Sequence, residues 1–284
     1  MVIPTYYRPE DLTELFRSLL KQTVKPFEVI IVDDTPTDMI KAVCEKYRTK
    51  FKRINTELIY IRNPRKRSAA VARNVGAEKA RGDIILFFDS DVILYVNYVE
   101  KIVEVFQQNA QAIGVQGRIT NFRKGKFYYL FQVYNKIFLF GHNTKNTCKL
   151  FDYPVRLEKI ISCEWLSGSN TAVKRSILGE FQFDENLTKY SYMEDDLFSH
   201  SIFQKYPNSL FMTPYAKCIH KVSQEGRIQN KKKLKVHKDA CRKYVLPMLF
   251  GSRGLFIYYW QTIGLLIFDL IRKIWRIKKQ RNKT

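Results

Sequence analysis

Cysteine is scarce in this sequence of 284 residues, and no two cysteines stand close enough to form a CxxC pair. The five are scattered and odd in number, which argues against a disulfide scaffold or a zinc ribbon and favours a reducing compartment. A signal peptide is also lacking, because the chain becomes polar within a few residues of Met1-Val2-Ile3-Pro4. We therefore expect a cytoplasmic protein.

Glycine-rich phosphate-binding loops are absent as well. Neither GxGxxG nor GxxxxGK[ST] occurs, so the sequence supports neither a Rossmann dinucleotide site nor a P-loop. If the protein binds a nucleotide, the phosphate charge must be met by other groups, such as a metal ion together with arginine.

Acidic residues are few, because 27 Asp and Glu stand against 49 Lys and Arg, for a formal net charge of +22. Residues 226–284 alone hold 16 Lys and Arg but 2 Asp and Glu. An excess of this size predicts an anionic partner, namely nucleic acid, an acidic membrane surface or a phosphorylated substrate. The hydrophobic fraction of 45% argues against a disordered chain.

One apolar run leads directly into two carboxylates. Residues 84–88 read as a fully buried strand of a parallel sheet, and Asp89-Ser90-Asp91 follows at its carboxyl end. Open α/β sheets bind their ligands at that end. Two carboxylates there can hold a hard divalent cation, which can hold a diphosphate. The alternative is a strand followed by a solvated acidic turn.

Strand and helix patterns alternate through the first 91 residues. Apolar strands are expected at 1–3, 27–32, 58–61 and 84–88. Helices are expected at 9–22, 37–47 and 68–80. This alternation predicts a mostly parallel sheet with helices on both faces. Polar loops 5–8, 33–34 and 89–91 would then meet at one edge, where a nucleotide should lie.

The second half of the chain is less regular. It should contain a helix at 98–108, strands at 112–120 and 210–215, a strand-turn-strand at 163–173, and a helix at 194–205. Residues 122–159 are aromatic-rich, basic and aperiodic. We expect them over the active face, as an acceptor-side lobe or lid.

Six short motifs occur in order along residues 1–222. They are Val2-Ile3-Pro4-Thr5-Tyr6-Tyr7-Arg8-Pro9, Val32-Asp33-Asp34, Ala72-Arg73-Asn74, Asp89-Ser90-Asp91, Leu166-Ser167-Gly168-Ser169-Asn170 and Glu194-Asp195. Each is weak alone, but together they resemble a family 2 glycosyltransferase with the Rossmann-like GT-A fold. Two departures are Tyr7, where the family usually has Asn, and the missing beginning of the first strand.

The resemblance implies an inverting transfer of a sugar from a nucleotide-sugar to an acceptor. It implies that Asp91, with Asp89 nearby, holds Mn²⁺ or Mg²⁺, which would stabilise the charge that develops on the leaving diphosphate. His220 occupies the place of a histidine that completes the metal shell in members of this family. The alternative for His220 is a plain surface residue beside Lys221.

The acceptor must lose a proton as it attacks, and a carboxylate is the expected general base. Asp195 matches the base of the family's E-D motif. Glu194 and Asp196 could raise its pKa through like-charge repulsion. Asp196 is the main competitor for the role, and the alternative for all three acids is that they merely cap a helix.

The resemblance also implies a nucleotide site and a donor and acceptor site. Asp33 or Asp34 would accept a hydrogen bond from the base, and Arg73 would pair with phosphate or base unless it is a solvated helix residue. The nucleotide site would comprise Pro4, Thr5, Tyr6, Arg8, Asp33, Asp34, Arg73, Asp89 and Ser90. Donor and acceptor would contact Trp165, Gly168, Ser169, Asn170, Glu194 and Asp196. Trp165 could equally be a core residue rather than a sugar platform.

The C-terminal region combines an apolar helix with basic flanks. Residues 255–271 are mostly apolar and are followed by a basic stretch at 272–279. The run is marginal for a transmembrane helix, which needs about 20 apolar residues. We favour an amphipathic helix lying on anionic lipid, over a buried helix with a solvated tail or a single span.

These observations predict a catalytic domain at 1–225, with a nucleotide-binding half at 1–120 and an acceptor half at 121–225, and a basic helical extension at 226–284. The expected function is metal-dependent transfer from a nucleotide-sugar, with UDP-sugar favoured, to a glycan or polyprenyl-linked acceptor in cell-surface polysaccharide or glycoconjugate synthesis. The expected location is the inner face of the cell membrane. Alternatives are a basic nucleic-acid- or membrane-binding protein without transferase activity, or a catalytically inactive sugar-nucleotide-binding protein. Nucleic acid is not expected, because the charge lies beside an apolar helix rather than along an aromatic groove.

Overall fold

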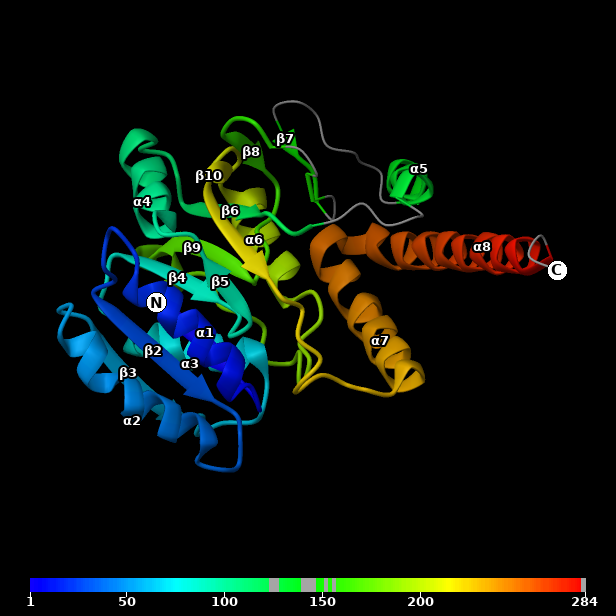
Figure 1. Ribbon diagram of the computed structural model, residues 1–284. Coiled ribbons are helices and arrows are strands. Elements are labelled where there is room, and N and C mark those ends of the chain that lie inside the picture. Colours follow the sequence, from blue (N-terminus) through cyan, green and yellow to red (C-terminus); the bar gives the residue numbers. More distant parts are fainter. Residues whose placement is uncertain (123–127, 139–146, 151–152, 155–156, 282–284) are drawn as a thin grey trace.

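A ten-stranded mixed sheet forms the centre of the structure, a computed structural model that describes residues 1–122, 128–138, 147–150, 153–154 and 157–281 (Figure 1). The strand order is β3-β2-β1-β4-β9-β6-β10-β8-β7, and β5 pairs with β10 beside this path. The mixture of parallel and antiparallel pairs around a parallel N-terminal half confirms the predicted fold class.

The N-terminal half alternates between strands and helices as the sequence predicts. Its strands are β1 (Val2–Thr5), β2 (Glu28–Asp33), β3 (Glu57–Arg62) and β4 (Ile84–Phe88). Its helices are α1 (Pro9–Leu20), α2 (Met39–Lys52) and α3 (Ala69–Lys79). All strand pairs among β1–β4 are parallel, so the loops that follow these strands share one edge of the sheet.

The second half introduces antiparallel strands. Its strands are β5 (Val92–Leu94), β6 (Gly114–Ile119), β7 (Thr147–Cys148), β8 (Ile161–Cys163), β9 (Asn170–Lys174) and β10 (Leu210–His220). Its helices are α4 (Tyr98–Gln108), α5 (Tyr128–Phe138) and α6 (Glu194–Lys205), with a 3₁₀ turn, η1 (Arg175–Gly179). Strand β9 lies antiparallel between β4 and β6. Strand β10 is longer than the predicted 210–215, and it pairs with β6 on both sides of a bulge.

Helices cover both faces of the sheet, because side chains alternate between the faces along each strand. Ile3 packs with α1, α2 and α4 in one buried cluster, whereas its neighbour Val2 packs with α3 and α6 in another. The unbroken apolar strands predicted from the sequence therefore each contribute to two cores.

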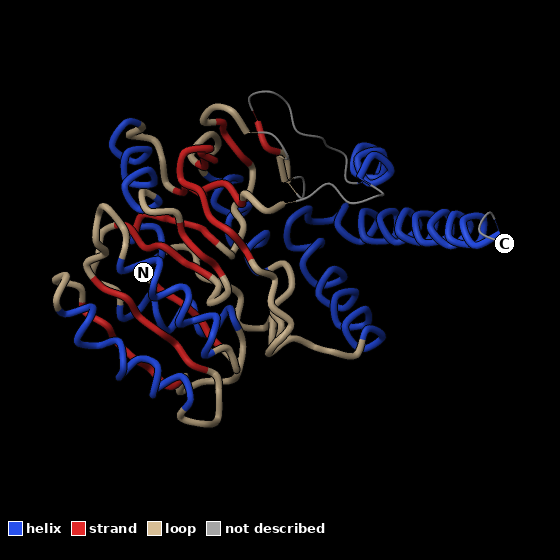
Figure 2. The backbone as a smooth tube through the Cα atoms, viewed as in Figure 1, coloured by secondary structure: helices blue, strands red, loops and turns tan. Residues whose placement is uncertain are grey.

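Three further segments complete the chain: α7 (Lys231–Phe250), a short 3₁₀ turn, η2 (Gly251–Arg253), and α8 (Gly254–Arg281). Helix α7 packs on the body, where Val245 and Leu246 are buried with Leu197 of α6. Helix α8 extends beyond the predicted 255–271 and projects away from the sheet (Figures 1 and 2).

Helix α5 packs against α8 rather than over the active face. The Trp260 indole donates a hydrogen bond to the Ile137 carbonyl at 3.2 Å, and its ring lies 5.1 Å from that of Phe138. A Cβ on Gly264 would meet the Phe138 ring at 2.4 Å, so only glycine permits this approach. The expected lid at 122–159 is therefore not formed by α5; residues 123–127, 139–146, 151–152 and 155–156 lie outside the described residues.

A long apolar stripe of α8 is exposed. By length and composition, the helical stretch Lys231–Trp275 contains a window that could cross a membrane, and 28% of that window is buried. Nine exposed apolar residues recur at helical spacing along one side of α8, whereas Leu265 and Trp275 lie outside this arc. The nine are Leu255, Phe256, Tyr259, Ile263, Leu266, Ile267, Leu270, Ile271 and Ile274. We call this set the α8 stripe.

Candidate active site

A cleft opens at the carboxyl ends of β1, β2 and β4, and it encloses a cavity of about 730 Å³. The loops that follow β1 and β4 line it together with Asp34, so the three polar loops meet as predicted. The remaining walls come from 165–169, from 189–196 at the start of α6, and from 226–229 before α7. Eight of the nine residues predicted to bind nucleotide line the cleft, all except Asp33: Pro4, Thr5, Tyr6, Arg8, Asp34, Arg73, Asp89 and Ser90.

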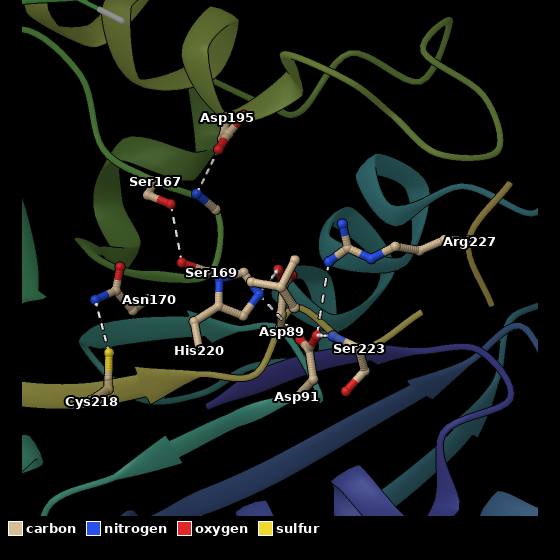
Figure 3. A network of polar contacts seen from close by, with 12 residues as sticks. Asp89, Asp91, Ser167, Ser169, Asn170, Asp195, Cys218, His220, Ser223 and Arg227 are labelled. Carbon is tan, nitrogen blue, oxygen red and sulfur yellow. Dashed lines mark hydrogen bonds and ion pairs between the residues drawn. The ribbon is translucent and has the colours of Figure 1, made fainter. Parts of the chain in front are cut away.

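Asp91, the second acid of the triplet, is fully buried and surrounded by cations (Figure 3). Its Oδ2 accepts a hydrogen bond from the Ser223 amide at 2.8 Å and lies 3.2 Å from Arg8 Nη1 and 3.8 Å from Arg227 Nη2. Burial raises the pKa of Asp91, but the His220 and Arg8 charges outweigh burial and hold the pKa at about 2. Asp91 is therefore a carboxylate at physiological pH.

Asp89, Asp91 and His220 form a group that could hold a metal ion. Their ligand atoms all lie within 4.8 Å of one another, with His220 Nε2 3.4 Å from Asp91 Oδ1 and 3.7 Å from Asp89 Oδ2. Within the described part of the chain, Asp91 Oδ1 and His220 Nε2 are buried without a hydrogen-bond partner. Such orphaned atoms fit a missing ligand, and two carboxylates with an imidazole suit Mn²⁺ or Mg²⁺.

The short strand β5 explains why His220 reaches this site. It pairs antiparallel with the end of β10, and the register places His220 beside Val92, the residue after Asp91. Strand β5 was not predicted, because three residues are too few for a periodic pattern. His220 is 16% exposed and lies with the triplet, not on the surface beside Lys221.

The two acids after β2 have different surroundings. Asp33 is fully buried, and it accepts hydrogen bonds from the Thr35 amide at 2.8 Å and the Tyr60 hydroxyl at 2.9 Å. Asp34 lines the cleft and accepts a hydrogen bond from Asn63 Nδ2 at 2.6 Å. Burial raises the pKa of Asp34 to about 6. Of the two, Asp34 is the acid that a nucleobase could reach.

Arg73 joins the triplet to the start of α6. Its side chain is 2% exposed, its Nη2 lies 2.9 Å from Asp89 Oδ1, and its Nη1 forms an ion pair with Glu194. A third contact runs to the Gly168 carbonyl at 3.2 Å. Arg73 is therefore not a solvated helix residue. Arg73 also lines the cleft. A direct contact from Arg73 to phosphate or base stays a prediction.

Asp195 lies on the cleft wall at the start of α6, apart from the Asp91 cluster (Figure 3). Its Oδ2 accepts a hydrogen bond from the Gly168 amide at 2.7 Å, and its Oδ1 accepts one from the Asp196 amide at 3.1 Å. Burial raises the pKa of Asp195, and these hydrogen bonds and Arg73 oppose the rise only in part. A buried carboxylate with raised pKa, facing a cavity, is suited to accept a proton.

The neighbours of Asp195 are also acidic and also line the cleft. Burial raises the pKa of Glu194 to about 8, against the opposing charge of Arg73. Burial, with the charges of Asp195 and Glu194, raises the pKa of Asp196 well above its ordinary value. Burial disfavours the charged form of both aspartates, but Asp195 accepts hydrogen bonds from two backbone amides, which favour its ionised form and support Asp195 as the base.

The segment 166–170 contributes to the cleft only in part. Gly168 and Ser169 line it, and the Ser169 hydroxyl lies 3.0 Å from that of Ser167. Asn170 is 1% exposed and donates to the Gly117 carbonyl at 2.9 Å and to Cys218 Sγ at 3.3 Å. Asn170 thus joins β9 to its neighbours and does not line the cleft, contrary to the predicted sugar contact.

Trp165 lies between the core and the cleft. One part packs against two buried clusters, and the indole donates to the Lys149 carbonyl at 2.9 Å. Another part lines the cleft. The sugar platform at Trp165 stays a prediction.

The loop between β10 and α7 was not predicted to line the cleft. Arg8 donates to the Glu225 carbonyl at 2.8 Å and to the Ser223 carbonyl at 3.1 Å, which holds this loop against the one after β1. Gly226 has φ +72°, and a Cβ there would lie 2.4 Å from the Tyr6 carbonyl oxygen. The Gly-Arg pair shortly after a strand end was the available signal.

Further cleft residues were not predicted either, among them two cations and two tyrosines. These four are Arg67, Lys189, Tyr190 and Tyr192. Tyr190 and Tyr192 precede the predicted base by a few residues, so their closeness in sequence to the E-D motif could have indicated a substrate wall.

Comparisons with known proteins fit this geometry. An uncharacterized glycosyltransferase of Haemophilus influenzae is 36% identical over 110 residues, which are 38% of this chain and 34% of the relative. TarS of Staphylococcus aureus, a poly(ribitol-phosphate) beta-N-acetylglucosaminyltransferase, is 37% identical over 93 residues, 32% of this chain and 16% of TarS. The matches thus span a minor part of these relatives' own length.

Solved structures share the fold. TarS residues 1–349 in complex with UDP-GlcNAc match with a TM-score of 0.54 at 19% identity, over 89% of this chain and 72% of that one. The mannosyltransferase PcManGT of Pyrobaculum calidifontis, in complex with GDP-Man and Mn²⁺, matches with a TM-score of 0.59 at 15% identity, over 94% and 73%. These likenesses show the GT-A fold.

A family model, Glycosyl transferase family 2, matches residues 1–180. This range contains five of the six motifs, the donor-side loops and the acid triplet. Because it also covers more than half of the sequence, the chain belongs to glycosyl transferase family 2.

Proposed function

We propose that the protein is an inverting, metal-dependent glycosyltransferase that moves a sugar from a nucleotide-sugar to a glycan or polyprenyl-linked acceptor. The proposal rests on one observation: two separate groups of acidic side chains lie at the same cleft. Asp89, Asp91 and His220 form a cation site, and Asp195, with its raised pKa, lies on a separate wall. Separate leaving-group and base sites are what a direct displacement requires.

The donor is best assigned as a UDP-sugar. The ionised Asp34 carboxylate can accept a hydrogen bond from uracil N3–H. The Tyr6 and Arg67 side chains line the same cleft as Asp34. The solved TarS complex contains UDP-GlcNAc, whereas the solved PcManGT complex contains GDP-Man. A guanosine donor is therefore the alternative to test.

We assign the remaining roles in the transfer reaction to residues of this cleft. Asp195 would take the proton of the acceptor hydroxyl as the acceptor oxygen bonds to the anomeric carbon and the bond to the diphosphate breaks. Arg8, whose Nη1 lies 3.2 Å from Asp91 Oδ2, would offset the negative charge of the departing diphosphate. A divalent cation held by Asp89, Asp91 and His220 would supply Lewis-acid stabilisation of that charge.

We place the enzyme at the cytoplasmic face of the membrane, in cell-surface polysaccharide or glycoconjugate synthesis. The exposed α8 stripe offers an apolar surface, and Arg272 and Lys273 near its end offer charge for anionic lipid. TarS, a relative in part of its length, is named for transfer to poly(ribitol-phosphate). A polymer or lipid-linked acceptor would suit an enzyme held at that surface.

The test is a thermal-shift and hydrolysis screen of UDP- and GDP-sugars, with Mn²⁺, with Mg²⁺ and with EDTA. We expect a UDP-sugar to stabilise the protein only with a cation and to be hydrolysed slowly. Asp91→Ala should abolish the cation dependence, because it removes a ligand that no neighbour replaces. No response to any nucleotide-sugar, together with tight binding of DNA or RNA, would reject the proposal in favour of nucleic-acid binding.

A further inference from the structure

Two tyrosine rings form part of the cleft wall that leads to the proposed base. Tyr190 and Tyr192 both line the cleft, and their rings are stacked with centroids 6.4 Å apart and planes inclined by 22°. Helix α7 fixes this wall, because His237 Nε2 lies 2.7 Å from the Tyr190 carbonyl oxygen. The pair therefore forms a preformed flat surface beside Asp195.

Two cations converge on these rings. The Arg227 guanidinium carbon lies 5.6 Å from the Tyr190 centroid. The Lys238 ammonium lies 5.8 Å from the same centroid and 4.7 Å from that of Tyr192. Two positive charges sharing one ring repel each other, and cation–π attraction to the ring opposes that repulsion.

Neither cation is fully compensated by the protein. Over the described ranges, no carboxylate forms an ion pair with Lys238, and Asp91, the acid partner of Arg227, is 3.8 Å away. The Nε–H of Arg227 is buried without an acceptor in the same part of the chain. Burial, and then the charge of Arg227, lower the pKa of Lys238. Such an arrangement is suited to a ligand that brings negative charge.

The acids on the same wall do not supply that charge. Glu194 forms an ion pair with Arg73, and the Asp195 carboxylate accepts hydrogen bonds from two backbone amides. Burial raises the pKa of Asp196, which favours its neutral form. The proposed cation site at Asp89, Asp91 and His220 accounts for the donor diphosphate. The negative charge that pairs with Lys238 should therefore come from the other substrate, the acceptor.

We propose that the acceptor is anionic, and that its phosphodiester or carboxylate group binds between Arg227 and Lys238 while its carbon skeleton packs on Tyr190 and Tyr192. This binding would present a neighbouring hydroxyl to Asp195. The inference rests on the proposed function, since it assigns the acceptor class of the same cleft. It adds a specificity-determining residue, Lys238, that no motif indicates.

The test measures acceptor binding with the donor site filled. The protein is saturated with UDP and Mn²⁺ and titrated with three oligomers: an oligo(glycerol phosphate), an oligogalacturonate and a neutral maltooligosaccharide. We expect one anionic oligomer to bind and the neutral one not to, and the comparison identifies phosphodiester or carboxylate as the charge. Lys238→Ala should weaken this binding about tenfold or more, as expected for loss of a charge-assisted contact, and Lys238→Arg should restore most of it.

Lys243→Ala is the matched control. Lys243 lies on the same helix, is exposed, and should change the affinity less than about twofold. Equal losses from Lys238→Ala and Lys243→Ala would overturn the proposal, since they would indicate non-specific attraction. Equal binding of the neutral oligomer, or weaker UDP binding in Lys238→Ala, would also overturn it. A thermal melt confirms that each variant folds, and absent sugar transfer with intact anion binding would reject the proposed function instead.

Discussion

The three acids that matter most in the cleft differ in what surrounds them. Asp91 is buried and held ionised by Arg8 and His220, whereas Asp89 pairs with Arg73 and is part exposed. Asp195 accepts two backbone hydrogen bonds and still has a raised pKa. The same side chain thus suits a cation ligand, a structural bridge or a base, according to its neighbours.

Replacement of the base should separate catalysis from binding. We expect Asp195→Asn to lower kcat by about 10²–10⁴-fold, the usual worth of general base catalysis. The affinity for UDP with Mn²⁺ should stay nearly constant, because the amide oxygen of Asn can still accept from the Gly168 amide. Steady-state kinetics and calorimetry measure the two quantities. Retention of more than about a tenth of kcat, with an inactive Asp196→Asn, would transfer the role to Asp196.

Asp34 should make nucleoside binding dependent on pH. Its pKa of about 6 lies above the ordinary value, so the carboxylate is present above pH 6 and is lost as the pH falls through that value. Because uracil N3–H donates to the ionised form, uridine affinity should fall about tenfold between pH 7.5 and pH 5. Titration with uridine in EDTA avoids any contribution from metal or phosphate. A flat profile in Asp34→Asn is the control, and a flat wild-type profile would reject the contact.

The sequence predicted which residues lie in the cleft better than it predicted their partners. Asp34, Asp89, Ser90 and Asp195 follow strand ends or begin a helix, and parallel strands bring such positions to one edge. Asn170 was predicted to lie in the cleft but does not line it. Its side-chain amide donates hydrogen bonds to Gly117 and Cys218, which lie on strands remote in sequence. Asp33 and Asp34 could not be distinguished either, since the difference depends on hydrogen bonds from Tyr60 and Asn63.

At the scale of elements, the same distinction between local and remote information applies. The parallel strands β1–β4 were predictable because each is a continuous apolar run between helices. The antiparallel insertion of β9 between β4 and β6 depends on pairing across the sheet, for which a single sequence carries no signal. The short strand β5 was missed for its length, although it brings His220 to Asp91.

The loop between β10 and α7 should contribute to donor binding. Gly226→Ala would strain a residue with positive φ and place a Cβ against the Tyr6 carbonyl. We expect the loop to shift and UDP affinity with Mn²⁺ to fall about tenfold, measured by calorimetry. Gly251→Ala is the control, because Gly251 also has positive φ but has nothing within 4 Å of an added Cβ. Similar nucleotide affinities in both variants would contradict a role for this loop in the donor site.

At the scale of the molecule, the boundary predicted at residue 225 remains a prediction, and the contacts favour a later one. Residues 226–229 line the cleft, and α7 packs on α6 through Val245 and Leu246. We therefore propose that α7 belongs to the catalytic body and that the extension begins near Gly254. The sequence did not indicate this division, because basic residues occur throughout 226–284. Their distribution does not show which part of the segment packs against the body.

The α8 stripe should bind anionic membranes. Leu266 and Leu270 are 61% and 59% exposed, so L266E/L270E should leave folding and UDP binding intact. Burying two leucines in lipid contributes about 1.5–3 kcal/mol each, so loss of both should weaken binding to phosphatidylglycerol vesicles about a hundredfold or more. Vesicle co-sedimentation measures this, and wild-type binding should fall with added salt because lysines and arginines contribute electrostatically.

Val236→Glu gives the matched control, since Val236 is apolar, 70% exposed and outside the stripe on α7. It introduces the same charge as each stripe substitution, so a loss of vesicle binding as large as that of L266E/L270E would indicate charge repulsion alone. Release of the wild-type protein by alkaline carbonate fits a helix that lies on the membrane, whereas resistance would indicate a span. A different result would be that the wild-type protein is a dimer in gel filtration and L266E/L270E is a monomer that still binds vesicles normally. The stripe would then contact a second copy instead of lipid.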